Sequence, residues 1–150
     1  MNLEELLTPE RCRAKVTGVS KKRVLNTLSD IVAAECPQLL ESDEVFAALL
    51  AREQLGTTGL SNGIAIPHCR LAQCDRVIGV LMTLDQGIDF DAIDAEPVDL
   101  VFALIVPEGR DDEHVQALGE IASLFQDDDL CFTLRQTFDD EDLYNIAIMT

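Results

Sequence analysis

The side chain best placed for chemistry is His68, one of two histidines in the chain. It follows Ile66 and Pro67 at the end of a glycine-rich stretch, residues 52–70. The residue before a proline favours extended backbone, so Ile66 should be strand-like and His68 should lie just past the end of that strand. An imidazole with an ordinary pKa of about 6.5 is mostly neutral at neutral pH and can act as a nucleophile or acid–base group. The plainer alternative is a loop histidine on a turn.

Arg52 is the second candidate, because it is expected to share the buried face of the helix that precedes the glycine-rich stretch. Ser42 is a good N-cap for that helix, and Val45, Leu49 and Arg52 fall on one stripe at helical spacing. A guanidinium pairs with phosphate oxygens through two parallel hydrogen bonds. The alternative role for Arg52 is a cation that complements the negative end of the helix dipole.

His114 is the third candidate and lies in the first turn of a later helix, for which Asp111 or Asp112 is the expected cap. Its helical spacing places it on the inward face, together with Leu118, Ile121 and Phe125. A core histidine hydrogen-bonded to a backbone carbonyl is the more common role for such a residue. The more specific hypothesis is that His114 works together with His68 in one site.

The glycine-rich loop could supply an anion-binding site, because successive backbone N–H groups can form a concavity for phosphate. With an imidazole and a guanidinium beside it, this favours a protein that carries or acts on a phosphoryl group. Walker-type, G-x-S-x-G and H-E-x-x-H motifs are absent from the sequence. The candidate phosphoryl- or partner-binding residues are Gly56, Thr57, Thr58, Gly59, Asn62 and Gly63.

The elements that must position these residues alternate between helices and strands. A helical turn is predicted over 3–7, an edge strand over 11–16 and a helix over 21–36 that is capped by Ser20 and ended by Pro37. Residues 77–84 and 98–106 are apolar on both faces, which indicates interior strands covered on two sides. Two short helices, over about 130–136 and 140–149 with Asp139 as a cap, follow the helix of His114.

Composition indicates one globular domain over residues 1–150, with 47% hydrophobic residues. The longest apolar run is too short to span a membrane, and the acidic N-terminus does not resemble a signal peptide, so we expect a cytoplasmic protein without membrane insertion. The five cysteines show no disulfide framework and should be reduced. A zinc site of His68, Cys69, Cys74 and His114 has no support from spacing, so we expect no metal and no cofactor.

The net charge of −17 is concentrated in the second half of the chain. Residues 1–84 carry nine Lys/Arg against ten Asp/Glu (9 − 10 = −1), and residues 85–150 carry two against eighteen (2 − 18 = −16). Such a surface repels a phosphate backbone and makes nucleic acid a poor partner. It suits a basic protein partner, or is simply a solvated acidic face.

Residues 53–69, EQLGTTGLSNGIAIPHC, closely resemble the signature of the mannitol/fructose class of enzyme IIA in the phosphoenolpyruvate-dependent phosphotransferase system. The resemblance spans nearly the whole chain, and residues 20–23, 90–94 and 97–107 are most similar to the nitrogen-regulatory branch. Ser61 departs from the glycine or alanine that the pattern prefers, and a positive φ there would be strained. The resemblance implies an α/β fold, an α+β sandwich in which helices flank both faces of a mixed central sheet.

The resemblance further implies a phosphotransferase in which His68 accepts a phosphoryl group from a small HPr-like carrier (NPr), itself phosphorylated by a phosphoenolpyruvate-dependent enzyme I. Arg52 and His114 match the supporting positions, where Arg52 would stabilise charge on the phosphoryl group and His114 would donate a hydrogen bond to its oxygens. Regulatory targets such as potassium-transport or sensor-kinase proteins are implied as partners.

Two other functions remain open from the sequence. One is a sugar-specific enzyme IIA that passes phosphate to a mannitol or fructose IIB component. The other is a regulatory binding module that controls its partners whether or not it turns over phosphate.

Overall fold

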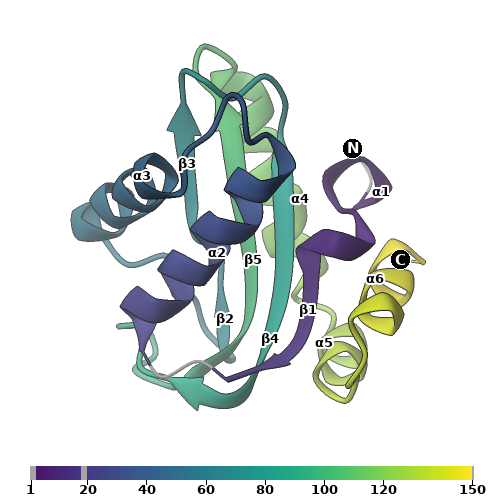
Figure 1. Ribbon diagram of the computed structural model, residues 1–150. Coiled ribbons are helices and arrows are strands. Elements are labelled where there is room, and N and C mark those ends of the chain that lie inside the picture. Colours follow the sequence, from purple (N-terminus) through teal and green to yellow (C-terminus); the bar gives the residue numbers. More distant parts are fainter. Residues whose placement is uncertain (1–2, 18–19, 150) are drawn as a thin grey trace.

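In the computed structural model, which describes residues 3–17 and 20–149, helices cover both faces of a five-stranded mixed sheet (Figure 1). This confirms the predicted fold class. The N-terminal elements are α1 (Leu3–Leu6), a 3-10 turn (Pro9–Arg11), β1 (Cys12–Val16), α2 (Lys21–Glu35) and α3 (Ser42–Leu55). The remaining elements are β2 (Ile64–Ala65), β3 (His68–Leu71), β4 (Ile78–Ile88), β5 (Val98–Pro107), α4 (Asp111–Leu124), α5 (Asp128–Arg135) and α6 (Asp140–Ile148).

The antiparallel pair β4 and β5 forms the centre of the sheet. β1 is parallel to β4 on one side, and β2 and β3 are both parallel to β5 on the other. Successive strand side chains point to opposite faces, so each central strand contributes to two hydrophobic clusters. Val80 and Ala103 face α2 and α3, whereas Leu81 and Phe102 face α4, α5 and α6. The interior strands expected from their continuous apolar sequence are therefore confirmed.

Capping by side chains agrees with the sequence for some helices and not for others. The Ser20 hydroxyl accepts a hydrogen bond from the backbone N–H of Arg23 and begins α2 as predicted. α3 begins with Glu41 at the N-cap, so the prediction of Ser42 as its cap is wrong. The Ser42 hydroxyl instead bonds the Asp30 carboxylate on α2, which ties the two helices together.

The cap predicted for α4 is also wrong. Arg110 occupies the N-cap without a side-chain hydrogen bond, and Asp111 is the first residue of the helix. Its carboxylate pairs with the Arg70 guanidinium on β3. The Asp111 side chain, which the local sequence suggests as a cap, thus forms an ion pair with β3 instead.

The backbone around His68 forms two short strands on the same edge of β5. β2 ends at Ala65, the chain passes through Ile66 and Pro67, and His68 is the first residue of β3. The Pro67 carbonyl accepts a hydrogen bond from Leu104 N–H at 2.9 Å. His68 therefore follows one strand, as expected, but it also begins another, which fixes its backbone on both sides.

The turn before β2 is made by residues with positive φ, Asn62 at 63° and Gly63 at 78°. Ser61 is not among the positive-φ residues of the described chain, so the strain that a serine could suffer there does not arise. Glycine adopts the positive φ of residue 63 without strain, and an added Cβ there would also displace the Arg135 guanidinium, which would lie 2.9 Å away.

Packing of α3 against the sheet is expected to be essential for stability. Leu49 is 1% exposed, and its truncation in Leu49→Ala should lower the free energy of unfolding by about 2–5 kcal/mol because a cavity is left. Leu55→Ala makes the same chemical change on the same helix at a residue that is 86% exposed, and it should change stability by less than about 0.5 kcal/mol. Urea unfolding of both variants checks this, and equal losses would contradict the placement of the helix.

Candidate functional site

A depression of about 710 Å³ lies where the end of α3, the start of β3 and the start of α4 meet. α3 contributes an apolar wall and the Arg52 guanidinium to this depression. β3 contributes an imidazole and a second guanidinium, and the segment that leads into and begins α4 contributes two carboxylates and a second imidazole. The residues around it are Ala48, Ala51, Arg52, Leu55, His68, Cys69, Arg70, Glu108, Gly109, Asp111 and His114. The structure thus brings Arg52, His68 and His114 into one pocket.

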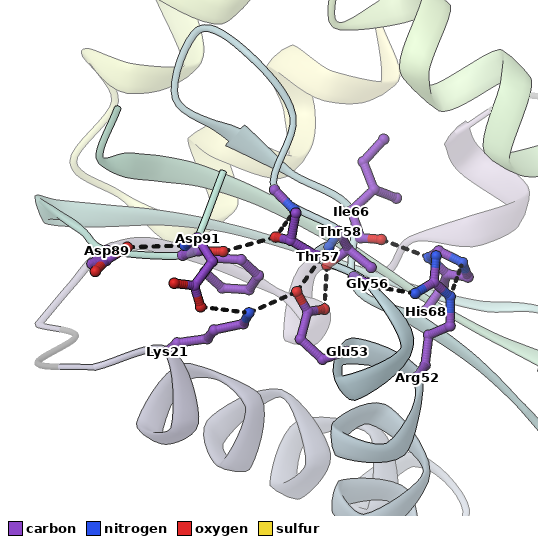
Figure 2. Close-up of polar contacts among 12 residues, drawn as sticks. Lys21, Arg52, Glu53, Gly56, Thr57, Thr58, Ile66, His68, Asp89 and Asp91 are labelled. Atoms are coloured by element: carbon purple, nitrogen blue, oxygen red, sulfur yellow. Dashed lines mark hydrogen bonds and ion pairs between the residues drawn. The ribbon is translucent and has the colours of Figure 1, made fainter. Parts of the chain in front are cut away.

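The two ring nitrogens of His68 have different partners. Nδ1 lies 2.7 Å from the carbonyl oxygen of Ile66, and Nε2 lies 3.2 Å from Nε of Arg52. A carbonyl only accepts and a guanidinium only donates, so Nδ1 carries the proton and Nε2 presents its lone pair. Both neighbours therefore select the same neutral tautomer, with Nε2 facing the arginine (Figure 2).

Arg52 is held between His68 and the end of its own helix. Its Nε donates to His68 Nε2, and its Nη1 donates to the carbonyl of Gly56 at 2.9 Å. Gly56 is the C-cap residue of α3, where carbonyl groups lack helical partners. Arg52 thus completes the helix terminus while aiming its guanidinium at the imidazole, so both of its predicted roles are compatible with the geometry.

His114 lies beside His68, with ring centroids 5.3 Å apart and planes inclined at 59°. Its Nδ1 is buried and has no hydrogen-bond partner among the described residues. A buried polar nitrogen without a partner costs roughly 1–3 kcal/mol, so Nδ1 of His114 can take up a hydrogen-bond partner that enters the pocket. The sequence also allowed a core histidine hydrogen-bonded to a backbone carbonyl, but Nδ1 of His114 makes no such bond.

Burial lowers the pKa of both histidines. For His68 desolvation is the main cause, the hydrogen bond to the Ile66 carbonyl opposes it, and the positive charge of Arg52 adds to it. For His114 desolvation again comes first, followed by the charge of Arg70. Because the pKa of His68 is lowered, the neutral imidazole with an unprotonated Nε2 persists to lower pH than for an exposed histidine.

The loop residues predicted to bind phosphate are not brought together at the pocket. The Gly56 carbonyl accepts a hydrogen bond from Arg52. The Thr57 hydroxyl donates one to the Phe90 carbonyl. Thr58 is buried against Glu53. None of the six loop candidates is among the residues that surround the depression.

Gly59, Asn62 and Gly63 serve the loop itself. An added Cβ at Gly59 would lie 2.9 Å from the Cα of Ala92, so this glycine is required for close backbone approach. Asn62 N–H donates to the Asp94 carboxylate, and Asn62 and Gly63 border a different depression, together with Asp94. The idea of a glycine concavity for phosphate therefore has no support in the geometry.

Sequence reasoning missed Arg70, Glu108 and Asp111, which also surround the depression. Alternation along a strand could have found Arg70, because residues two apart share a face and Arg70 is two residues after His68. The carboxylates could not be found in this way, since they come from the connection into α4. The Arg70–Asp111 ion pair links β3 to the start of α4, the helix that carries His114.

Within residues 3–17 and 20–149, no cluster of three or more His, Cys, Asp or Glu side chains has the geometry of a metal site. In the same residues, no helix combines the length and hydrophobicity that crossing a membrane requires. The cysteines are buried thiols, and burial raises the pKa of Cys69, next to His68, to about 12. A neutral thiol of this kind is a poor metal ligand and a poor nucleophile.

Comparison with known proteins gives a consistent result. Residues 5–148 match the family model described as the phosphoenolpyruvate-dependent sugar phosphotransferase system, EIIA 2. A nitrogen regulatory protein of Pseudomonas aeruginosa is 45% identical over 148 residues, which cover 99% of this chain and 96% of that protein. The crystal structure of the nitrogen regulatory protein IIA-Ntr of Neisseria meningitidis superposes with a TM-score of 0.89 at 32% identity, covering 97% of this chain and 98% of that one.

The mannitol IIA of Escherichia coli has the same fold. Its crystal structure superposes with a TM-score of 0.75 at 23% identity and covers 94% of this chain and 99% of that one. The sheet flanked by helices is therefore shared between nitrogen-regulatory and mannitol proteins, and the higher identity lies on the nitrogen-regulatory side.

The electrostatic environment of His68 predicts a specific titration. By NMR, His68 should titrate below the ordinary pKa of about 6.5, and Arg52→Gln should raise its pKa, because the variant removes both a positive charge and a donor to the Nε2 lone pair. Arg23→Gln, at an exposed residue near the start of α2, removes the same charge elsewhere and should leave the His68 titration in place. A fall of the pKa in Arg52→Gln would contradict the assigned contact.

Proposed function

The chain belongs to the EIIA type 2 family of the phosphoenolpyruvate-dependent sugar phosphotransferase system, and we propose that it is a nitrogen-regulatory enzyme IIA that carries a phosphoryl group on His68. Membership of the family implies phosphotransfer between histidine-containing components, a transferase role. The finer proposal is that the donor is the phosphohistidine of an HPr-like carrier (NPr), which is itself charged by enzyme I. The observation that carries the assignment of His68 as the acceptor is its tautomer, in which Nε2 has a lone pair and no proton.

In the proposed step the Nε2 lone pair of His68 attacks the phosphorus of the carrier's phosphohistidine. The bond from phosphorus to the carrier's nitrogen breaks, its electron pair returns to the carrier's imidazole, and a new Nε2–phosphorus bond forms. Positive charge develops on the His68 ring as the lone pair is donated. The Ile66 carbonyl, at 2.7 Å from Nδ1, stabilises that charge through its hydrogen bond.

Arg52 and His114 support the transfer in this proposal. Arg52 gives up its hydrogen bond to Nε2 when phosphorus arrives and turns to the phosphoryl oxygens, where guanidinium N–H groups stabilise spread negative charge. The His114 ring, 5.3 Å from that of His68, is close enough for a nitrogen to donate to one of the same oxygens. Both groups already lie beside His68 before reaction, so only a local turn of the Arg52 side chain is needed to meet the positioning that a loose phosphoryl transition state requires.

The nitrogen-regulatory assignment is supported by the relatives that match along nearly their whole length. The nitrogen regulatory protein of Pseudomonas aeruginosa is 45% identical, whereas the mannitol IIA of Escherichia coli is 23% identical. We therefore propose a cytoplasmic, single-domain regulator that spans residues 1–150 and acts on target proteins, such as potassium-transport or sensor-kinase proteins, according to its phosphorylation state. Transfer to a sugar-specific IIB component is the alternative for the same site.

Labelling with phosphoenolpyruvate, enzyme I and the HPr-like carrier tests the acceptor. The native protein should gain one acid-labile phosphoryl group, and His68→Ala should gain none. His114→Ala should be labelled at a rate reduced by roughly 10²-fold, because one donor to the phosphoryl oxygens is lost while the nucleophile remains. Full labelling of His68→Ala would exclude His68 as the acceptor, and complete loss of labelling in His114→Ala alone would assign the acceptor to His114.

Regulation by phosphorylation state predicts a difference in target capture. Capture of a target protein by the native protein should change when phosphoenolpyruvate, enzyme I and the carrier are added, and capture by His68→Ala should not change. A pull-down with both proteins measures this. If the native protein captures the target equally well in both states, it is a binding module independent of phosphate turnover. If it instead passes its phosphoryl group to a mannitol or fructose IIB component, it belongs to the sugar branch.

A further inference from the structure

A buried carboxylate lies immediately behind the pocket and has no part in the chemistry described so far. Glu53 is 7% exposed although it carries a charge and lies in the last turn of α3. Its Oε1 accepts a hydrogen bond from Thr58 N–H at 2.8 Å, and its Oε2 accepts one from the Thr58 hydroxyl at 2.6 Å. Lys21 Nζ lies 2.9 Å from Oε1 (Figure 2). Glu53 therefore clamps Thr58 through both oxygens.

Thr58 connects this clamp to the imidazole. Its carbonyl accepts a hydrogen bond from Ile66 N–H at 3.1 Å, and the carbonyl of Ile66 accepts the proton of His68 Nδ1 at 2.7 Å. The acceptor that fixes the His68 tautomer is therefore carried on a peptide segment held by Glu53. Glu53 is also the neighbour in sequence of Arg52, which contacts the other ring nitrogen.

We propose that Glu53 is a positioning residue, which holds the Ile66 carbonyl and the Arg52 guanidinium in register with the two nitrogens of His68. The proposal rests on the function proposed above, in that the positioned atom is the phosphoryl acceptor Nε2. Glu53 itself does not touch the reacting atoms. It acts through Thr58 on one side and through the last turn of α3 on the other.

Lys21 makes this arrangement possible in a buried environment. A buried carboxylate is stable only when it is paired and hydrogen-bonded, and Lys21 supplies the opposite charge from the first turn of α2. The same ammonium group lies 3.3 Å from Asp91 and 4.9 Å from the centre of the Phe90 ring. Four segments, namely the start of α2, the end of α3, the loop before β2 and the segment between β4 and β5, are thereby joined at one point.

The tautomer of His68 gives a test that does not depend on phosphoryl transfer. Proton–nitrogen NMR of the side chains distinguishes a protonated Nδ1 from a protonated Nε2, and with two histidines the spectrum is assigned from His68→Ala. The native protein should show His68 with the proton on Nδ1. Glu53→Gln and Thr58→Val should both populate the Nε2–H tautomer, because the Ile66 carbonyl is no longer held against Nδ1. The His68 pKa should fall in both variants, and Thr58→Val isolates the effect of the carbonyl, because Glu53→Gln also removes a negative charge that raises this pKa.

The rate of transfer from a saturating phosphorylated carrier provides the second measurement. Glu53→Gln and Thr58→Val should each lower this rate about 10-fold to 10²-fold, as expected for a misplaced nucleophile, with little change in the carrier concentration needed for half-saturation. Thr58→Ser keeps the hydroxyl and should recover most of the rate. Glu44→Gln makes the same change of charge at an exposed residue of α3 and serves as the matched control.

The outcomes separate the possibilities. A loss of stability in Glu53→Gln with an unchanged His68 tautomer and an unchanged rate would overturn the proposal and leave Glu53 a purely structural residue. If Glu53→Gln does not fold, Thr58→Val decides by the same two measurements, since it removes one hydrogen bond and no charge. If the native protein accepts no phosphoryl group, the proposed function fails, and the tautomer measurement still shows whether Glu53 positions His68.

Discussion

The hydrogen bond from His68 Nδ1 to the Ile66 carbonyl is the interaction on which the site depends. Either nitrogen of a neutral imidazole can carry the proton, and only the other one has a lone pair that can act as a nucleophile. The hydrogen bond made by one nitrogen therefore decides which nitrogen is the nucleophile. Here the acceptor lies two residues earlier in the same chain, so its position is set by the backbone. Pro67 lies between them, and its carbonyl is bonded to Leu104 N–H of β5, which fixes that backbone to the centre of the sheet.

Local charge explains how a strongly acidic chain can place a guanidinium group beside the His68 imidazole. The net charge is −17, yet Arg52 and Arg70 both surround the depression, together with two imidazoles. Charges on an exposed surface are screened over about 8–10 Å at physiological ionic strength, whereas charges in a partly buried pocket are screened much less. Glu108 and Asp111 also surround the depression, and Asp111 pairs with Arg70, so Arg52 is the cation that directly contacts His68. Most of the other carboxylates of the second half of the chain lie on exposed helix termini.

Periodicity predicted the parts of the site that lie on the inward faces of regular elements. Arg52 shares a stripe with buried Val45 and Leu49, and His114 shares one with Ile121, so a helical wheel was enough to turn them inward. The roles of Gly59 and Glu53 could not be predicted in this way. Gly59 is required by its approach to Ala92 and Glu53 is buried by Lys21 and Thr58, and these contacts join segments that no local pattern connects. The wrong caps of α3 and α4 have the same cause, because Ser42 and Asp111 bond to other elements.

Phosphorylation at Nε2 and the hydrogen bond from Arg52 to Nε2 exclude each other, because both need the same lone pair. Under the proposed function, the two states of His68 therefore differ in more than the added group. In one state the guanidinium is shared between the imidazole and the Gly56 carbonyl at the end of α3, and in the other it faces phosphoryl oxygens. Leu55, which precedes Gly56, is exposed beside the depression. A partner that contacts this rim would meet two guanidinium groups balanced by two carboxylates in one state and added negative charge in the other. The charge added at a single nitrogen is therefore sufficient to distinguish the two states without rearrangement of the sheet.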